Sequence, residues 1–179
     1  EQGRLNGNTV VTTVMSNLGL YKSLERENMN YEQTAVGDKY VAENMMENGY
    51  SLGGEQSGHI IFSRYAATGD GILTSLMIME ACVEQKATLC DLAKEMKVYP
   101  QLLRNVRVAD KKTARENPKV VEAVEAVAKA LGEDGRILVR ESGTEPLIRV
   151  MVEAGTDEIC RENVEQVVRV MEAEGLIVE

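Results

Sequence analysis

The sequence predicts an α/β fold in two parts: a three-layer parallel-sheet domain, then a small α+β domain whose antiparallel sheet carries helices on one face. The first hundred residues alternate strand-like and helix-like patterns, which is typical of a parallel α/β unit. The remaining residues read strand, helix, strand, strand, helix. Because Tyr99-Pro100 requires extended backbone before the proline, we place the domains at residues 1–99 and 100–179.

In the first domain, the β-branched stretch 8–15 predicts a strand, and Ser16-Asn17 are good N-caps for the helix that follows it. A second strand and a second helix follow, and Gly49 ends that helix. The stretch "GDGILTSLMIMEACVEQ" is apolar on nearly every side, so it predicts a buried helix. The other expected elements are a helix to about Asn28, a strand at 31–36, extended segments at 50–58 and 59–66, and a short helix that ends near Lys97.

In the second domain, Asn117-Pro118 supplies an N-cap and a first-turn proline for a helix that Gly132 ends. Thr156 caps the last helix, and acidic residues in its first turn suit the helix dipole. The expected strands are 102–110, 136–140 and 146–154, and the apolar helix faces are Val120, Val124, Val127, Leu131 and Val164, Val167, Val168, Met171.

Composition narrows the class of protein. The 179 residues carry a net charge of −9, which argues against nucleic-acid and anionic-membrane partners. Three cysteines without a C-x-x-C pair, no apolar run of membrane-spanning length and no signal peptide predict a cytoplasmic protein. The chain opens "EQGRLNGN" without an initiator methionine, so we expect it to be a piece of a longer protein.

The stretch "RESGTEPLIR" predicts a hairpin with an anion site at its end. Side chains alternate along a strand, so if the apolar rows on both strands face the helices, Arg140 and Arg149 emerge together on the free face. Ser142 and Thr144 add hydroxyls, and Gly143 permits close backbone approach. Such planar guanidinium groups and donors suit a phosphate dianion.

Two other interpretations of this hairpin stay open. Exposed strand arginines are common, and S-G-T-E-P also makes an acceptable structural turn. Ser142 as a nucleophile is a third interpretation, but no base lies near it in sequence, and the single histidine, His59, belongs to the other domain.

The stretch "GGEQSGH" places Glu55, Ser57 and His59 at alternate positions, so in extended backbone all three side chains point the same way. A carboxylate, a hydroxyl and an imidazole suit a polyhydroxylated ligand. The alternative is a tight turn with incidental polar residues. His59 has no partners at metal-ligand spacing, so we expect no metal site here.

The paired motifs "GGEQSGH" and "RESGTEPLIR" resemble the third and fourth domains of the α-D-phosphohexomutases. The stretches "TVVTTVMSNLGL", "TAVGDKYV", "TGDGILT" and "YPQLLRNVRV" resemble most the bacterial members that act on glucosamine phosphates. The resemblance covers nearly the whole chain. It implies that the sugar is bound by Glu55, Ser57 and His59, with Lys39 facing the same cleft, and that the non-reacting phosphate is bound by Arg140, Ser142, Gly143, Thr144 and Arg149.

The resemblance also implies what this chain lacks. Family members carry a phosphoserine in the first domain and an aspartate-rich Mg²⁺ loop in the second, and neither motif occurs here. We therefore expect no catalytic and no metal-ligating residue in this chain. The implied whole enzyme interconverts glucosamine 6-phosphate and glucosamine 1-phosphate, with Mg²⁺, a glucosamine or glucose 1,6-bisphosphate activator and N-terminal domains as partners. The alternative is a non-catalytic phosphosugar-binding or regulatory module.

Overall fold

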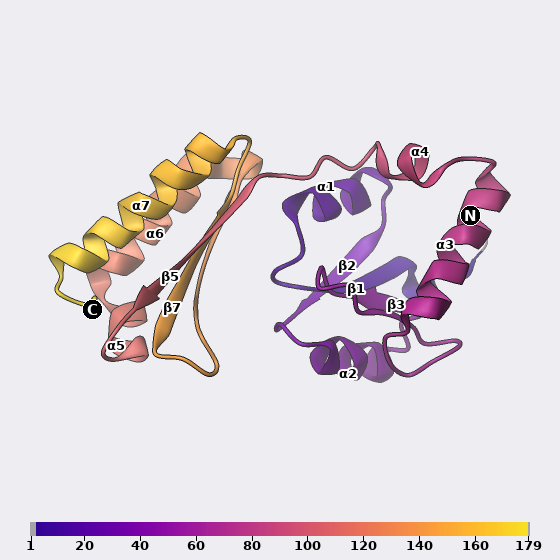
Figure 1. Cartoon of the computed structure of the whole chain (residues 1–179), viewed down its shortest axis with the longest axis horizontal. Helices are drawn as coiled ribbons and strands as arrows, with labels where there is room; N and C mark the ends of the chain where they lie inside the picture. The colour runs from indigo at the N-terminus through magenta and orange to yellow at the C-terminus, as the bar shows by residue number, and fades with distance from the viewer. Residues whose placement is uncertain (1–2, 179) are drawn as a thin grey trace. The chain divides into compact units, whose positions relative to one another are not determined.

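The computed structural model describes residues 3–178. The chain divides into two compact units, one ending at Val98 and the other beginning at Tyr99 (Figure 1). The sequence placed this boundary one residue later. Each unit has its own sheet and its own hydrophobic core.

The first unit is built on a four-stranded sheet with the strand order β2-β1-β3-β4. The strands β1, β2 and β3 are parallel, as predicted, but β4 pairs antiparallel with β3. The sheet is therefore mixed, because the short connection between β3 and β4 is a hairpin and cannot form a parallel crossover. The bounds are β1 Thr9–Thr13, β2 Asn30–Thr34, β3 Leu52–Gly54 and β4 Ile60–Phe62.

The first helix of this unit begins at a predicted cap, and the second ends at the predicted glycine. The side chain of Asn17 accepts a hydrogen bond from the backbone N–H of Gly19, and Gly49 ends α2 in the left-handed conformation. The helix α2 covers one face of the sheet, where Val11, Val41, Met45 and Ile61 form a buried cluster. The bounds are α1 Leu18–Arg26, α2 Asp38–Asn48, α3 Gly71–Gln85, α4 Leu89–Ala93 and the 3-10 turn η1 Asn6–Asn8.

The prediction of a buried helix is wrong for α3. None of its residues is buried, and Ile72 and Val83 are more than three-quarters exposed. A cavity of about 470 Å³ lies beside the helix, with Leu52 and Phe62 of the sheet and Ile78 of α3 in its lining. The helix α3 is therefore apolar, as predicted, but the rest of the unit is too small to cover all of its sides.

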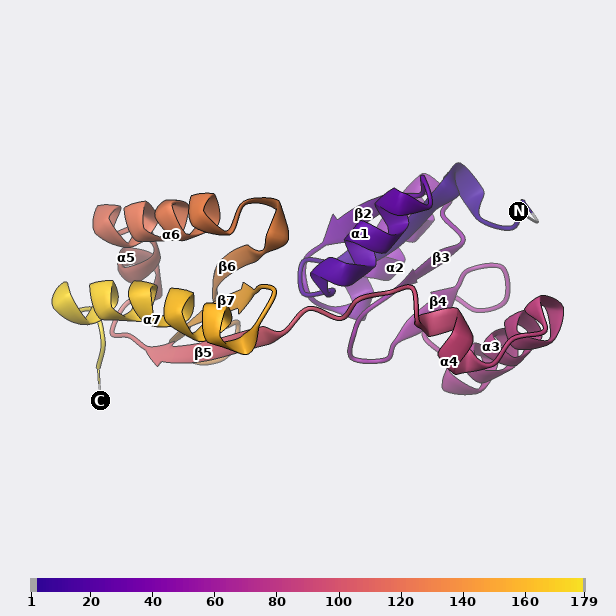
Figure 2. The same ribbon diagram turned by 90° about the horizontal axis from the view of Figure 1, so that it is seen from above.

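The second unit is a three-stranded antiparallel sheet with helices on one face, as predicted. The strand order is β5-β7-β6, so β7 is central. Helices α6 and α7 run side by side over the sheet (Figures 1 and 2). The bounds are β5 Gln101–Arg107, α5 Lys111–Glu116, α6 Pro118–Leu131, η2 Gly132–Asp134, β6 Arg136–Glu141, β7 Leu147–Glu153 and α7 Asp157–Ala173.

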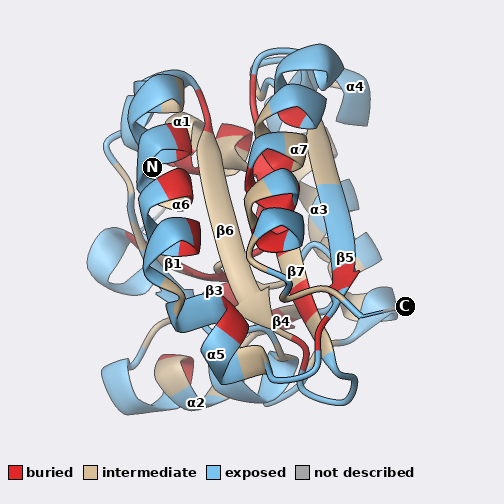
Figure 3. Cartoon of the chain, turned by 90° about the vertical axis from the view of Figure 1, so that its left-hand side faces the viewer, coloured by how far each residue is buried: buried red, intermediate tan, exposed pale blue. Residues whose placement is uncertain are grey.

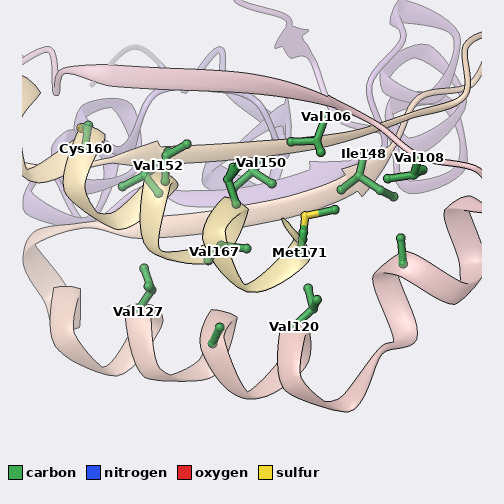
Figure 4. Packing of buried hydrophobic residues seen from close by; sticks show 14 of the residues in the cluster. Val106, Val108, Val120, Val127, Ile148, Val150, Val152, Cys160, Val167 and Met171 are labelled. Atoms are coloured by element: carbon green, nitrogen blue, oxygen red, sulfur yellow. The ribbon is translucent and has the colours of Figure 1, made fainter. Parts of the chain in front are cut away.

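One face of β7 fixes the orientation of this sheet. Ile148, Val150 and Val152 are fully buried and pack against the helices (Figure 4). The buried sides of α6 and α7 meet this face, whereas their outer sides are exposed (Figure 3). Because side chains alternate along a strand, Arg149 between two of these core residues must point to the opposite face. We call this the free face because α6 and α7 do not pack against it.

The short helix α5 was not predicted. Asp110 caps it through a 2.6 Å hydrogen bond from the backbone N–H of Thr113, and Ala114 joins the core of the second unit. Its single turn and a half carries too few apolar residues to produce a recognisable helical period. It lies on the helical side of the sheet (Figure 1) and contacts β6 and β7.

Candidate functional site

Two arginines stand directly opposite each other on the free face of the second sheet. The register pairs Arg140 of β6 with Arg149 of β7, while Ile137 and Val139 of β6 pack toward the core. The strand alternation predicted this placement, and the structure agrees with it. Side chains opposite each other in an antiparallel pair have Cβ atoms about 5 Å apart, so two positive charges are held next to one another.

Both guanidinium groups have donors without acceptors. Among the residues that the structure describes, only three buried side-chain nitrogen or oxygen atoms have no hydrogen-bond partner, and two are the Nε atoms of Arg140 and Arg149. Leaving a buried donor unpaired costs about 1–3 kcal/mol. Burial, and then the positive charge of Arg149, lower the pKa of Arg140 from its ordinary value. An anion between the two arginines would relieve both unfavourable terms.

The loop between the strands supplies further donors. Ser142 is only 1% exposed, and its hydroxyl accepts a 3.4 Å hydrogen bond from Nη2 of Arg149. A carboxylate oxygen of Glu145 lies 3.7 Å from Nη2 of Arg149, so it can hold that guanidinium in place. Gly143 and Thr144 are exposed at the tip. The site residues predicted in this domain therefore all lie at one end of the hairpin.

The glycine-rich stretch of the first unit does not have the extended backbone that we expected. The backbone N–H of Gly58 donates to the carbonyl of Glu55 at 3.0 Å, and Gly58 has a φ of 97°. The chain therefore makes a tight turn between β3 and β4. The hydroxyl of Ser57 still lies 3.2 Å from Nδ1 of His59.

Glu55 is tied to a different loop. Its Oε1 accepts a 2.8 Å hydrogen bond from the backbone N–H of Gly37, which precedes α2. Gly37 has a φ of 137°, a value that favours glycine. This contact joins the β3–β4 turn to the loop after β2. Lys39 follows Gly37 at the start of α2, where its Nζ lies 3.7 Å from the carboxylate of Glu43.

These polar residues gather where ligands commonly bind in α/β proteins. Glu55 directly follows β3, and Lys39 lies at the start of α2, just after the loop that follows β2. Both are therefore at the carboxyl ends of parallel strands, an edge that frequently forms a binding crevice. Ser57 and His59 are exposed on the same turn as Glu55. The structure thus brings the predicted residues of this domain to one edge of its sheet.

One residue of interest was missed by the sequence analysis. Nζ of Lys111 donates a 2.8 Å hydrogen bond to the backbone carbonyl of Ser142 in the arginine hairpin. Lys111 lies in the unpredicted helix α5, 31 residues before Ser142, so no local pattern indicates the contact.

Within residues 3–178 no group of three or more histidine, cysteine or acidic side chains is placed to hold a metal ion. No helix in that range is long and apolar enough to cross a bilayer.

Comparison with known proteins assigns both units to one family. Residues 1–99 match the model described as phosphoglucomutase/phosphomannomutase, alpha/beta/alpha domain III, and residues 103–175 match that family's C-terminal domain. The chain therefore belongs to the phosphoglucomutase/phosphomannomutase family.

Within the family, the chain is similar in sequence to bacterial phosphoglucosamine mutases. It is 60% identical over 177 residues to that of Lachnoclostridium phytofermentans and 56% identical over 174 residues to that of Bacillus cytotoxicus. These alignments cover 99% and 97% of this chain but only 40% and 39% of the relatives. The chain thus spans about two-fifths of the length of these relatives.

Solved structures share the fold. Aspergillus fumigatus N-acetylphosphoglucosamine mutase in complex with GlcNAc-6P and magnesium matches with a TM-score of 0.77 and 20% identity, over 93% of this chain and 39% of that one. A single-residue variant of the same fungal enzyme, in complex with glucose 1,6-bisphosphate, matches with a TM-score of 0.76 and 20% identity, over 94% and 39% of the two chains. At this identity the likeness concerns the fold.

The contact between Glu55 and Gly37 generates a prediction about the loops of the first unit. In the Glu55→Ala variant, the amide of Gly37 should exchange with solvent about tenfold to a hundredfold faster, because a hydrogen bond to a charged acceptor is lost. Amide hydrogen exchange followed by NMR measures this. The control is Gln56→Ala, an exposed neighbour in the same turn. Unchanged exchange in the first variant, or equal acceleration in both, would contradict the contact.

Proposed function

We propose that this chain is the substrate-binding half of a phosphoglucosamine mutase, which interconverts glucosamine 6-phosphate and glucosamine 1-phosphate. The observation that carries the proposal is the arginine pair on the free face of the second sheet, with both Nε–H groups buried and unpartnered. The similarity to bacterial phosphoglucosamine mutases supplies the choice of sugar.

In this proposal the second unit grips the phosphate that does not react. Arg140 and Arg149 contribute charge-assisted hydrogen bonds, which are short and suited to phosphate oxygens. The hydroxyls of Ser142 and Thr144 and the backbone N–H of Gly143 complete the donor set. Held at this end, the sugar is oriented without any bond being made or broken by these residues.

The first unit binds the sugar hydroxyls. One oxygen of Glu55 is engaged with Gly37, and the other remains available to accept from a hydroxyl group. The hydroxyl of Ser57 and the imidazole of His59 lie beside each other in the same turn. Lys39, at the start of α2, adds a positive charge near that edge of the sheet.

Phosphoryl transfer itself is assigned to other parts of the whole enzyme. The reaction needs a phosphoryl donor and a cation that neutralises developing charge. The fungal relative was crystallised with magnesium, and its variant with glucose 1,6-bisphosphate. The described side chains of this chain offer no donor cluster that fits Mg²⁺. We therefore assign Mg²⁺ and a glucosamine or glucose 1,6-bisphosphate activator to a cytoplasmic whole enzyme whose N-terminal domains complete the site.

The phosphate-site proposal is tested by titrating glucosamine 6-phosphate into the chain. Half a cleft leaves the rest of the ligand in water, so we expect a Kd on the order of millimolar, about 4 kcal/mol of binding. Arg140→Ala and Arg149→Ala should each weaken binding roughly tenfold to a hundredfold, as expected for a lost charge-assisted hydrogen bond. Amide chemical shifts in NMR report the affinity.

The matched control is Arg104→Ala, because Arg104 carries the same charge but lies on the helix-facing side of β5, opposite Val150. Its removal should weaken binding far less than the other two substitutions. Equal losses of affinity in all three variants would show that the arginines act only through their overall charge and form no specific site. Unaltered affinity in both Arg140→Ala and Arg149→Ala would refute it.

A second prediction concerns catalysis. This chain alone should not convert glucosamine 6-phosphate, even with Mg²⁺ and glucose 1,6-bisphosphate, because the proposal places the phosphoserine donor in another domain of the whole enzyme. A coupled assay for glucosamine 1-phosphate measures this, with an intact bacterial phosphoglucosamine mutase as the positive control. Turnover by the purified chain, above that of an identically purified Arg140→Ala sample, would show that catalytic residues lie within it.

A further inference from the structure

The carbonyl of Ser142 is held from the helical side of the second unit. Nζ of Lys111, the first residue of α5, donates to it at 2.8 Å. Ala114, one turn further along α5, is buried in the core that α6, α7 and the inner face of β7 form. The carbonyl of Ser142 is therefore directed toward the helix layer, away from the free face where Arg140 and Arg149 lie.

Peptide geometry then fixes the next N–H. A peptide bond is planar, and in the trans form its C=O and N–H point in opposite directions. The described chain has no cis peptide bond. When the carbonyl of Ser142 points to Lys111, the N–H of Gly143 must point away from α5. Arg149, whose side chain lies on the face of the sheet opposite the helices, contacts the hydroxyl of the same Ser142 through Nη2.

Gly143 itself is not required by the fold. A Cβ added at this position would meet no atom within 4 Å, and the φ of Gly143 does not lie in the positive range that favours glycine. Neither packing nor backbone conformation therefore explains a glycine here. A residue without a side chain does allow a ligand to approach the backbone N–H closely.

From these contacts we infer that Lys111 is a positioning residue of the phosphate site. By holding the carbonyl of Ser142, it aims the N–H of Gly143 at the phosphate and keeps the carbonyl oxygen from facing the anion. This inference rests on the proposed function, because it assumes that a phosphate lies between Arg140 and Arg149. Lys111 acts through the backbone and need not touch the ligand.

The test uses inorganic phosphate as the probe and the full 179-residue chain at constant ionic strength. In the unmodified chain, phosphate should shift the amide signal of Gly143 together with those of Arg140 and Arg149. In Lys111→Met, the Gly143 shift should be lost and the affinity should fall about three- to tenfold, the loss expected for one hydrogen bond. Lys111→Arg, which keeps the donor and the charge, should restore most of both.

The matched control is Lys112→Met, which removes the same charge from the next, exposed residue of α5. A merely electrostatic role for Lys111 predicts equal weakening in Lys111→Met and Lys112→Met, and that result would overturn the inference. If phosphate does not shift the amide signal of Gly143 in the unmodified chain but does shift those of Arg140 and Arg149, the inference is also overturned. The proposed function then stays intact. If none of these three amide signals shifts on addition of phosphate, the proposed function is refuted instead.

Lys111→Met must be shown to be folded, which the amide signals of the α6–α7 core report. If it is not folded, Lys111→Leu takes its place, since it also removes both the charge and the hydrogen-bond donor. The same criteria apply: loss of the Gly143 response with an intact core supports the inference, and an unchanged response contradicts it.

Discussion

The function proposed for the second unit depends on two positively charged side chains that lie next to each other on the same face of its sheet. Arg140 and Arg149 occupy directly opposed positions, and each carries a buried Nε–H without an acceptor. Such an arrangement is unfavourable in the free protein, because like charges opposed across strands repel and unpaired buried donors lose their hydration. A dianion bound between the two groups would attract both positive charges and accept hydrogen bonds from both Nε–H groups. The rest of the site is arranged around this pair.

The scaffold explains how the arginine pair is held in place. The central strand β7 is fixed by three fully buried side chains, Ile148, Val150 and Val152, against a layer of two long helices. Arg149 alternates with these residues, so it cannot leave the free face unless the core is disrupted. A site on a strand that is anchored in this way is held more rigidly than a site on a loop alone, which suits a group that has to orient a small ligand.

The two predicted half-sites differ in how firmly the chain itself organises them. In the second unit, Ser142 is buried and its hydroxyl, carbonyl and N–H are all engaged. In the first unit, Ser57 and His59 are exposed, and Glu55 connects two loops through one hydrogen bond. This contrast agrees with the proposal that the second unit anchors a phosphate and that other domains of a whole enzyme enclose the sugar.

The sequence predicted those features that depend on local periodicity. Strand alternation predicted the placement of Arg140 and Arg149, and the caps Asn17, Asn117 and Thr156 marked helix starts that the structure confirms.

Features that depend on tertiary contacts were not predicted from the sequence. Alternation in "GGEQSGH" assumed extended backbone, whereas the close pairing of β3 with β4 forces a turn at Gly58. The apolar composition of α3 predicted burial, but the amount of covering surface is a property of the whole unit. The contact of Lys111 with Ser142 exists only because α5 packs against β6 and β7, and no spacing rule within one stretch of sequence contains that information.

The most direct test of the arginine pair observes its two Nε–H groups. In a ¹H–¹⁵N spectrum of the arginine side chains, the Nε–H signals of Arg140 and Arg149 should both move on addition of glucosamine 6-phosphate, with one shared Kd. The signal of Arg104, on the other side of the sheet, should stay in place. Movement of only one of the two signals, or equal movement of all three, would contradict the claim that the pair forms a single phosphate site.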